Sequence, residues 1–130
     1  MNTTEFFLRW NGKYLDVDGV FGPQCVDVTK KYFLDVLGLP VFKGNAIDYW
    51  NKVVPGFKKI RNNPWNFPMP GDIIIWRNTP SNPFGHIAIC NWSRLWDFSS
   101  FDQNYPIGYP CHYQYHNYKD VVGWLRPINN

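Results

Sequence analysis

The apolar run Ile73-Ile74-Ile75-Trp76 constrains the fold of this 130-residue chain more than any other feature. It follows a Gly-Asp turn signal, and its unbroken apolar character predicts a buried strand over residues 71–76. The next segment, 77–85, is rich in Asn, Pro, Ser and Gly, which predicts a turn-rich connection. The segment 86–92 then predicts a second strand, and we expect the two strands to pair.

Helix signals precede these strands and further strand signals follow them. Helices are predicted from Thr3 to near Asn11, from Pro23 to about Leu37, and over 44–50. The segments 94–103, 111–118 and 121–127 predict strands, and the proline-rich segment 51–70 predicts a loop. This order predicts one α+β domain over residues 1–130, with N-terminal helices packed on an antiparallel sheet.

Charge and apolar patterning exclude several classes of protein. The net charge of +3 is not clustered, and no motif resembles a nucleic-acid-binding one, so we expect no nucleic-acid partner. No apolar run approaches the ~20 residues of a membrane span. The first twelve residues, MNTTEFFLRWNG, lack the pattern of a signal peptide. Three cysteines, an odd number, argue against a closed disulfide framework.

Cys25 is the first candidate for chemistry, and it lies in the stretch DVDGVFGPQCVD, residues 16–27. The predicted helix places this thiol in the first turn, where the helix dipole favours a thiolate. The three neighbouring aspartates have the opposite effect. From these residues alone, Cys25 is a reactive thiol, a metal ligand or a packed core residue.

A nucleophilic cysteine needs a base, and His86 is the best placed of three histidines. It opens the strand 86–92, where strand alternation places it on one face with Ala88 and Cys90. Asp102 and Asn104 lie two residues apart, and either side chain could orient the imidazole. The alternatives are that His86 is a half-buried structural histidine and that Asp102 and Asn104 are ordinary polar residues at the end of a strand.

The aspartates predict a separate function. Asp16 and Asp18 lie on the turn at Gly19 and Asp27 returns from the helix, so three hard oxygen ligands converge, which suits Ca²⁺. The spacing is not that of an EF-hand, and turn and cap chemistry is the alternative. His112 and His116 would suit zinc on a helix, but their alternation with tyrosines predicts a strand that separates them by roughly 13 Å.

Five motifs in this order resemble the CHAP family, the cysteine, histidine-dependent amidohydrolases/peptidases: DVDGVFGPQCVD, GNAIDYW, PGDIIIW, GHIAI and DQN. The resemblance runs from about Asp16 to the C-terminal WLRP and is greatest to phage lysins that cleave Gram-positive peptidoglycan. It implies a single CHAP catalytic domain with a papain-like α+β fold. It also implies an endopeptidase or an N-acetylmuramoyl-L-alanine amidase acting through a thioester acyl-enzyme.

The resemblance also implies a role for each matching position. Cys25 becomes the nucleophile, His86 the base and Asp102 the third catalytic residue, with Asn104 a nearby polar residue that some members use. Gln24 could contribute to the oxyanion hole. In several such lysins calcium binds at the stretch matching Asp16, Asp18, Val20, Gly22 and Asp27, where Val20 and Gly22 could offer only their carbonyl oxygens.

The remaining expectations concern the substrate and the setting. We expect a monomer that takes peptidoglycan as substrate, uses calcium and needs no organic cofactor. A phage lysin is made in the host bacterial cytoplasm without a signal peptide and acts on the cell wall. Trp65, Trp76 and Tyr105 are candidates to shape the substrate groove. The alternative function is a non-catalytic cell-wall-binding module that retains the fold.

Overall fold

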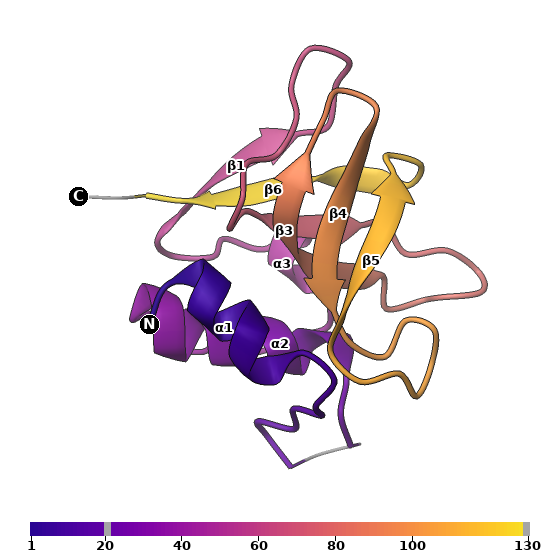
Figure 1. The fold of residues 1–130 in the computed structure, drawn as a ribbon. Coiled ribbons are helices and arrows are strands. Elements are labelled where there is room, and N and C mark those ends of the chain that lie inside the picture. Colours follow the sequence, from indigo (N-terminus) through magenta and orange to yellow (C-terminus); the bar gives the residue numbers. More distant parts are fainter. Residues whose placement is uncertain (20–21, 129–130) are drawn as a thin grey trace.

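The computed structural model describes residues 1–19 and 22–128 of the chain (Figure 1). Short helices occupy the first part of the chain and strands the second part. The elements are α1 (Thr3–Trp10), α2 (Cys25–Tyr32), a π-helical turn η1 (Phe33–Leu37), α3 (Asp48–Asn51), β1 (Phe57–Arg61), β2 (Ile73–Trp76), β3 (His86–Ser93), β4 (Asp97–Asp102), β5 (His112–Asn117) and β6 (Val121–Pro127).

The central helix begins two residues later than predicted. Gln24 is its N-cap with an extended backbone, so Pro23 lies just before the helix and Cys25 is its first residue. Asp27 Oδ2 accepts from the Gln24 backbone N–H at 2.8 Å, which fixes this start. The helical run continues through η1 to Gly38, whose φ of 64° ends it. Across residues 1–19 and 22–128, no helix is long and apolar enough to cross a membrane.

All six strands form one antiparallel sheet in the order β1-β6-β2-β3-β4-β5. The predicted pairing of β2 with β3 is confirmed, with Trp76 opposite His86. The prediction of a loop over 51–70 is wrong at β1, which pairs with β6 at the edge of the sheet. Its sequence, FKKIR, has no clean apolar alternation, so its pairing depends on the exposed edge of β6 rather than on a local pattern.

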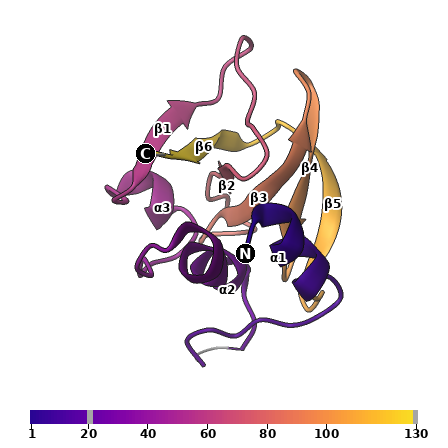
Figure 2. The same cartoon turned by 60° about the vertical axis from the view of Figure 1, so that its left-hand side comes forward.

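The two faces of the sheet carry different cores. Phe6 and Tyr32 from the helices pack with Ile87 and Phe101 on one face. The opposite face holds a smaller cluster made of Ile74, Cys90, Phe98, Val121 and Trp124. Figures 1 and 2 show a curved sheet with α1 and α2 lying against one side of it. The predicted α+β architecture is therefore confirmed.

Candidate active site

A cavity of about 840 Å³ opens at the N-terminal end of α2. Cys25, the first residue of that helix, lies on its wall and is partly exposed. Trp76 and Tyr105 line the cavity as predicted, whereas Trp65 is 85% exposed and is not among the described lining residues. The wall is completed by Gln24, Val26, Asn45, Ala46, Arg77, Thr79, Ser81, Asn82, Phe84, Gly85, His86, Asn104, Ile107 and Asp120.

His86 enters the same cavity from the start of β3. The preceding Gly85 has φ +74°, and a Cβ there would lie 2.8 Å from the Trp76 carbonyl oxygen, so only glycine suits this turn. The imidazole is almost fully buried between two aromatic rings, with centroids 4.9 Å from Trp76 and 4.6 Å from Tyr105. The aromatic contacts hold the ring plane and limit its access to water.

Asp102 completes a line of three side chains. Its Oδ2 lies 3.0 Å from His86 Nε2 and also accepts from the Ser100 hydroxyl at 3.2 Å. Because Nε2 faces the carboxylate, Nδ1 is the imidazole nitrogen left for the thiol of Cys25. The structure thus brings together the three residues predicted to form the catalytic set, from α2, β3 and β4.

The electrostatics favour a charged imidazole. Burial lowers the pKa of His86, but its interactions with Asp102 and Cys25 outweigh burial and raise that pKa to about 9. Burial acts to raise the pKa of Asp102, yet its interactions with His116 and His86 hold that pKa below its usual range. Asp102 is therefore an anion at neutral pH, poised to stabilise an imidazolium.

All three histidines of the chain converge on this carboxylate. His116 Nε2 lies 3.6 Å from Asp102 Oδ2, and His112 Nε2 lies 4.0 Å from Oδ1. With its amide nitrogen facing the site, Gln114 donates to Asp102 Oδ1 at 3.2 Å. The sequence reasoning predicted the β5 strand but missed this role. Alternation places residues 112, 114 and 116 on one face, and the partner opposite His112 is Asp102.

Asn104 lines the cavity but is held differently from Asp102. It adopts φ 64°, and its Oδ1 accepts from the Gly108 N–H at 2.7 Å. Its own N–H donates to the Tyr109 carbonyl at 3.0 Å. Asn104 therefore shapes the turn that follows β4, and its place as an alternative third catalytic residue stays a prediction.

Gln103 is the residue that sequence reasoning missed most clearly. Its side chain is fully buried and bridges to the segment before α2. Oε1 accepts from Leu15 N–H at 2.7 Å, and Nε2 donates to the carbonyls of Leu15 at 2.8 Å and Gln24 at 2.9 Å. Strand alternation could have identified it, because a residue after Asp102 faces the helix side of the sheet. Gln103 thus ties the strand of Asp102 to the residue preceding Cys25.

Replacing Gln103 with Leu should lower the free energy of unfolding by about 2–5 kcal/mol, because the buried N–H and carbonyl of Leu15 and the partly buried carbonyl of Gln24 lose their partner. Urea unfolding measures this change. Gln114→Leu is the matched control, since Gln114 is only half-buried, and its effect should be smaller. Equal stability of Gln103→Leu and the parent protein would contradict the bridging role.

The other two cysteines lie in very different surroundings. Cys90 and Cys111 are fully buried, and burial raises the pKa of each thiol to about 12. Neither forms a disulfide, and neither is among the lining residues described for the cavity. Both belong to the apolar clusters of the sheet, so they are packed structural residues.

Iodoacetamide at neutral pH should therefore modify Cys25 alone in the native protein, because the thiolate is the reactive form. Peptide mass mapping after brief labelling checks this, with urea-unfolded protein as the control in which all three thiols react. Modification of Cys90 or Cys111 at a rate similar to that of Cys25 would contradict it.

The three predicted calcium ligands also meet. Asp16, Asp18 and Asp27 offer oxygens within 4.8 Å of one another, the one such group in the part of the chain that the structure describes. Their hard oxygen donors fit a calcium ion. Gly22 lies nearby in sequence in a turn with φ +71°, whereas Val20 lies outside the described residues.

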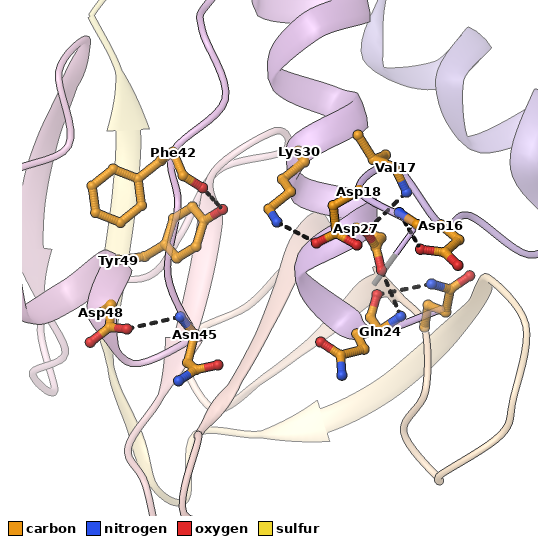
Figure 3. Close-up of polar contacts among 12 residues, drawn as sticks. Asp16, Val17, Asp18, Gln24, Asp27, Lys30, Phe42, Asn45, Asp48 and Tyr49 are labelled. Atoms are coloured by element: carbon orange, nitrogen blue, oxygen red, sulfur yellow. Dashed lines mark hydrogen bonds and ion pairs between the residues drawn. The ribbon is translucent and has the colours of Figure 1, made fainter. Parts of the chain in front are cut away.

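The cluster already makes bonds within the chain (Figure 3). Asp27 is fully buried and accepts from the N–H groups of Val17 at 3.0 Å and Gln24 at 2.8 Å. Burial raises the pKa of Asp27, these two bonds oppose that effect, and the charges of Asp18 and Asp16 reinforce it. Asp18 in turn accepts from the ammonium of Lys30.

Comparisons with known proteins agree with this geometry. A family model described as the CHAP domain matches residues 14–104. Endolysin PlyTW of Staphylococcus phage Twort is 36% identical over 76 residues, which cover 57% of this chain and 16% of that protein. The crystal structure of endolysin LysIME-EF1 superposes with a TM-score of 0.83 at 28% identity, covering 98% of this chain and 64% of the other. Ly7917, at 18% identity and a TM-score of 0.69 over 97% of this chain and 61% of the other, shares the fold.

Proposed function

The chain belongs to the CHAP domain family, and on that premise we propose that it is a peptidoglycan hydrolase whose nucleophile is Cys25. The observation that carries the proposal is that Cys25 and His86 line one cavity while the buried Asp102 lies 3.0 Å behind His86. The endolysins it resembles are longer proteins, of which this chain spans 16% and 64%. The papain-like α+β fold supplies the helix N-terminus and the facing strand that this chemistry requires.

The proposed reaction is an acyl transfer in two steps. The Cys25 thiolate attacks an amide carbonyl carbon, forming a C–S bond, and the tetrahedral intermediate collapses by breaking the C–N bond. The His86 imidazolium gives its proton to the leaving amine. A water molecule then attacks the thioester while His86 accepts its proton, the C–S bond breaks, and the carboxylate product leaves. Asp102 holds the ring and stabilises its charged form.

The oxyanion hole is proposed at the start of α2. The backbone N–H of Cys25 lies in the first helical turn, where N–H groups have no acceptor within the helix. The Gln24 side chain lines the same cavity and can supply a second donor. Both donors lie beside the thiol, where negative charge develops on the carbonyl oxygen.

The cavity wall suits a peptide substrate. Asn45, Asn82 and Asn104 offer amide hydrogen-bonding groups, while Trp76 and Tyr105 offer flat apolar surfaces. Neutral donors and acceptors of this kind match the amides of stem peptides and cross-bridges. The same wall suits the substrate of an endopeptidase and that of an N-acetylmuramoyl-L-alanine amidase, since both enzymes cut an amide bond next to a peptide.

We propose calcium as a structural ion at Asp16, Asp18 and Asp27, with carbonyl oxygens of Val20 and Gly22 as further ligands. An ion there would balance the negative charge near the thiol. Calcium chloride should raise the melting temperature, and a chelator should reverse the effect, because a ligand that binds only the folded state stabilises it.

The decisive experiment incubates the protein with purified Gram-positive peptidoglycan and identifies the released fragments by mass spectrometry. New amino and carboxyl termini would support hydrolysis and identify the bond that is cut. Co-sedimentation with the walls without any released fragment would instead support the non-catalytic wall-binding module.

As a phage lysin, the protein would be a monomer made in the host cytoplasm and active on the cell wall.

A further inference from the structure

Lys30 is an unusual residue for its position. It lies in α2 one turn after Asp27, and only 7% of it is exposed, whereas lysines are rarely buried without a partner. Its ammonium lies 2.8 Å from Asp18 Oδ2, within the group of three carboxylates (Figure 3). A buried cation therefore already contacts the cluster.

The charge balance of the cluster explains why such a cation is useful. Three carboxylates within 4.8 Å repel one another, and Asp27 is fully buried. Asp27 has its oxygens bonded to backbone N–H groups, so its charge is solvated by the chain itself. Asp18 is more exposed, with 35% of its side chain accessible, and it forms an ion pair with the ammonium of Lys30.

We propose that Lys30 is a built-in cation of this carboxylate cluster and that a calcium ion must compete with it for Asp18. The second part rests on the proposed calcium site. A calcium ion that binds Asp18 must either displace the ammonium of Lys30 or bind with that ammonium still nearby. The first costs the existing ion pair and the second places two cations close together, so both lower the affinity for calcium. The chain thus folds with its cluster partly neutralised before calcium binds, and it binds calcium more weakly than the same carboxylates would alone.

Calcium titration of two matched variants tests the competition. Lys30→Met keeps an unbranched side chain that is one atom shorter and removes its charge. Lys31→Met makes the same change at the neighbouring position, where the ammonium pairs with Asp35 at 3.3 Å. Isothermal titration with calcium chloride should show a Kd at least tenfold lower for Lys30→Met than for the parent, and a Kd within twofold of the parent for Lys31→Met.

Melting temperatures in EDTA test the built-in cation without any calcium. Lys30→Met should melt below the parent, because the cluster loses its counter-charge, while Lys30→Arg should stay close to the parent. Adding Asp18→Asn to Lys30→Met should recover part of the lost melting temperature, since it removes the charge that Lys30 neutralised.

The outcomes separate the two parts. A calcium Kd for Lys30→Met equal to or above that of the parent overturns the competition. Absence of calcium binding by the parent and by Lys30→Met overturns the calcium site and the competition together. A further fall in melting temperature on adding Asp18→Asn, in EDTA, overturns the role of Lys30 as a counter-charge whatever calcium does.

Discussion

Replacing Cys25 with Ala is expected to lower the rate of peptidoglycan hydrolysis by at least about 10³-fold, because removing a covalent nucleophile leaves only binding and oxyanion stabilisation. The fall in turbidity of Gram-positive cells measures lysis, and the release of free amines from purified walls measures bond cleavage. Both readouts should fall together, since Cys25 is the only thiol that lines the described part of the cavity.

The control for this variant is its stability. Cys25 is partly exposed at the cavity wall, so Cys25→Ala should fold and melt close to the parent protein. It should also still bind walls in a sedimentation assay. Lysis by Cys25→Ala at the parental rate would exclude Cys25 as the nucleophile.

Replacing Asp102 with Asn is expected to lower kcat/KM by about 10²–10⁴-fold, because the uncharged amide no longer stabilises the imidazolium. The pH profile should change as well. The raised pKa of His86, about 9, means that the charged form, and the activity that needs it, is lost as pH rises through about 9. Without the carboxylate this pKa falls, so the alkaline limb should move to lower pH.

The same pKa shift makes a statement about stability. A histidine whose pKa rises on folding contributes stability that is complete below its unfolded pKa of 6.5 and is lost as pH rises toward about 9. Asp102→Asn should therefore narrow the stability difference between pH 6 and pH 9.5. Chemical denaturation at these two pH values measures it.

Asn104→Ala serves as the matched control for the third catalytic residue. Asn104 holds a turn through Gly108, so its replacement should lower activity less than Asp102→Asn and leave the alkaline limb in place. If Asn104→Ala moved that limb and Asp102→Asn did not, the assignment of the third residue would have to be exchanged.

Local sequence pattern was sufficient for most of the elements that carry the site. The glycine before His86 acts over a few residues, so the start of β3 could be recognised from the chain alone. The start of α2 was predicted two residues early, because proline suits the first helical turn whereas Gln24 is the residue that caps the helix. The alternation in residues 111–118 likewise follows from the greater burial of one strand face, whereas β3 is buried on both faces. The edge strand β1 was missed because it has no clean apolar alternation, and its pairing with β6 joins segments far apart in the chain.

The tertiary structure alone decided which charged and polar groups interact with one another. Asp102 meets His86, His112 and His116 only because β3, β4 and β5 adopt their particular register. Gln103 reaches Leu15 across 88 positions of the chain. Electrostatic and hydrogen-bonding partners depend on distances of a few ångströms, which the spacing along a sequence does not determine. For the same reason the aspartates around Cys25 could be recognised as a cluster from the sequence, while the buried lysine that neutralises them could be recognised only in the folded chain.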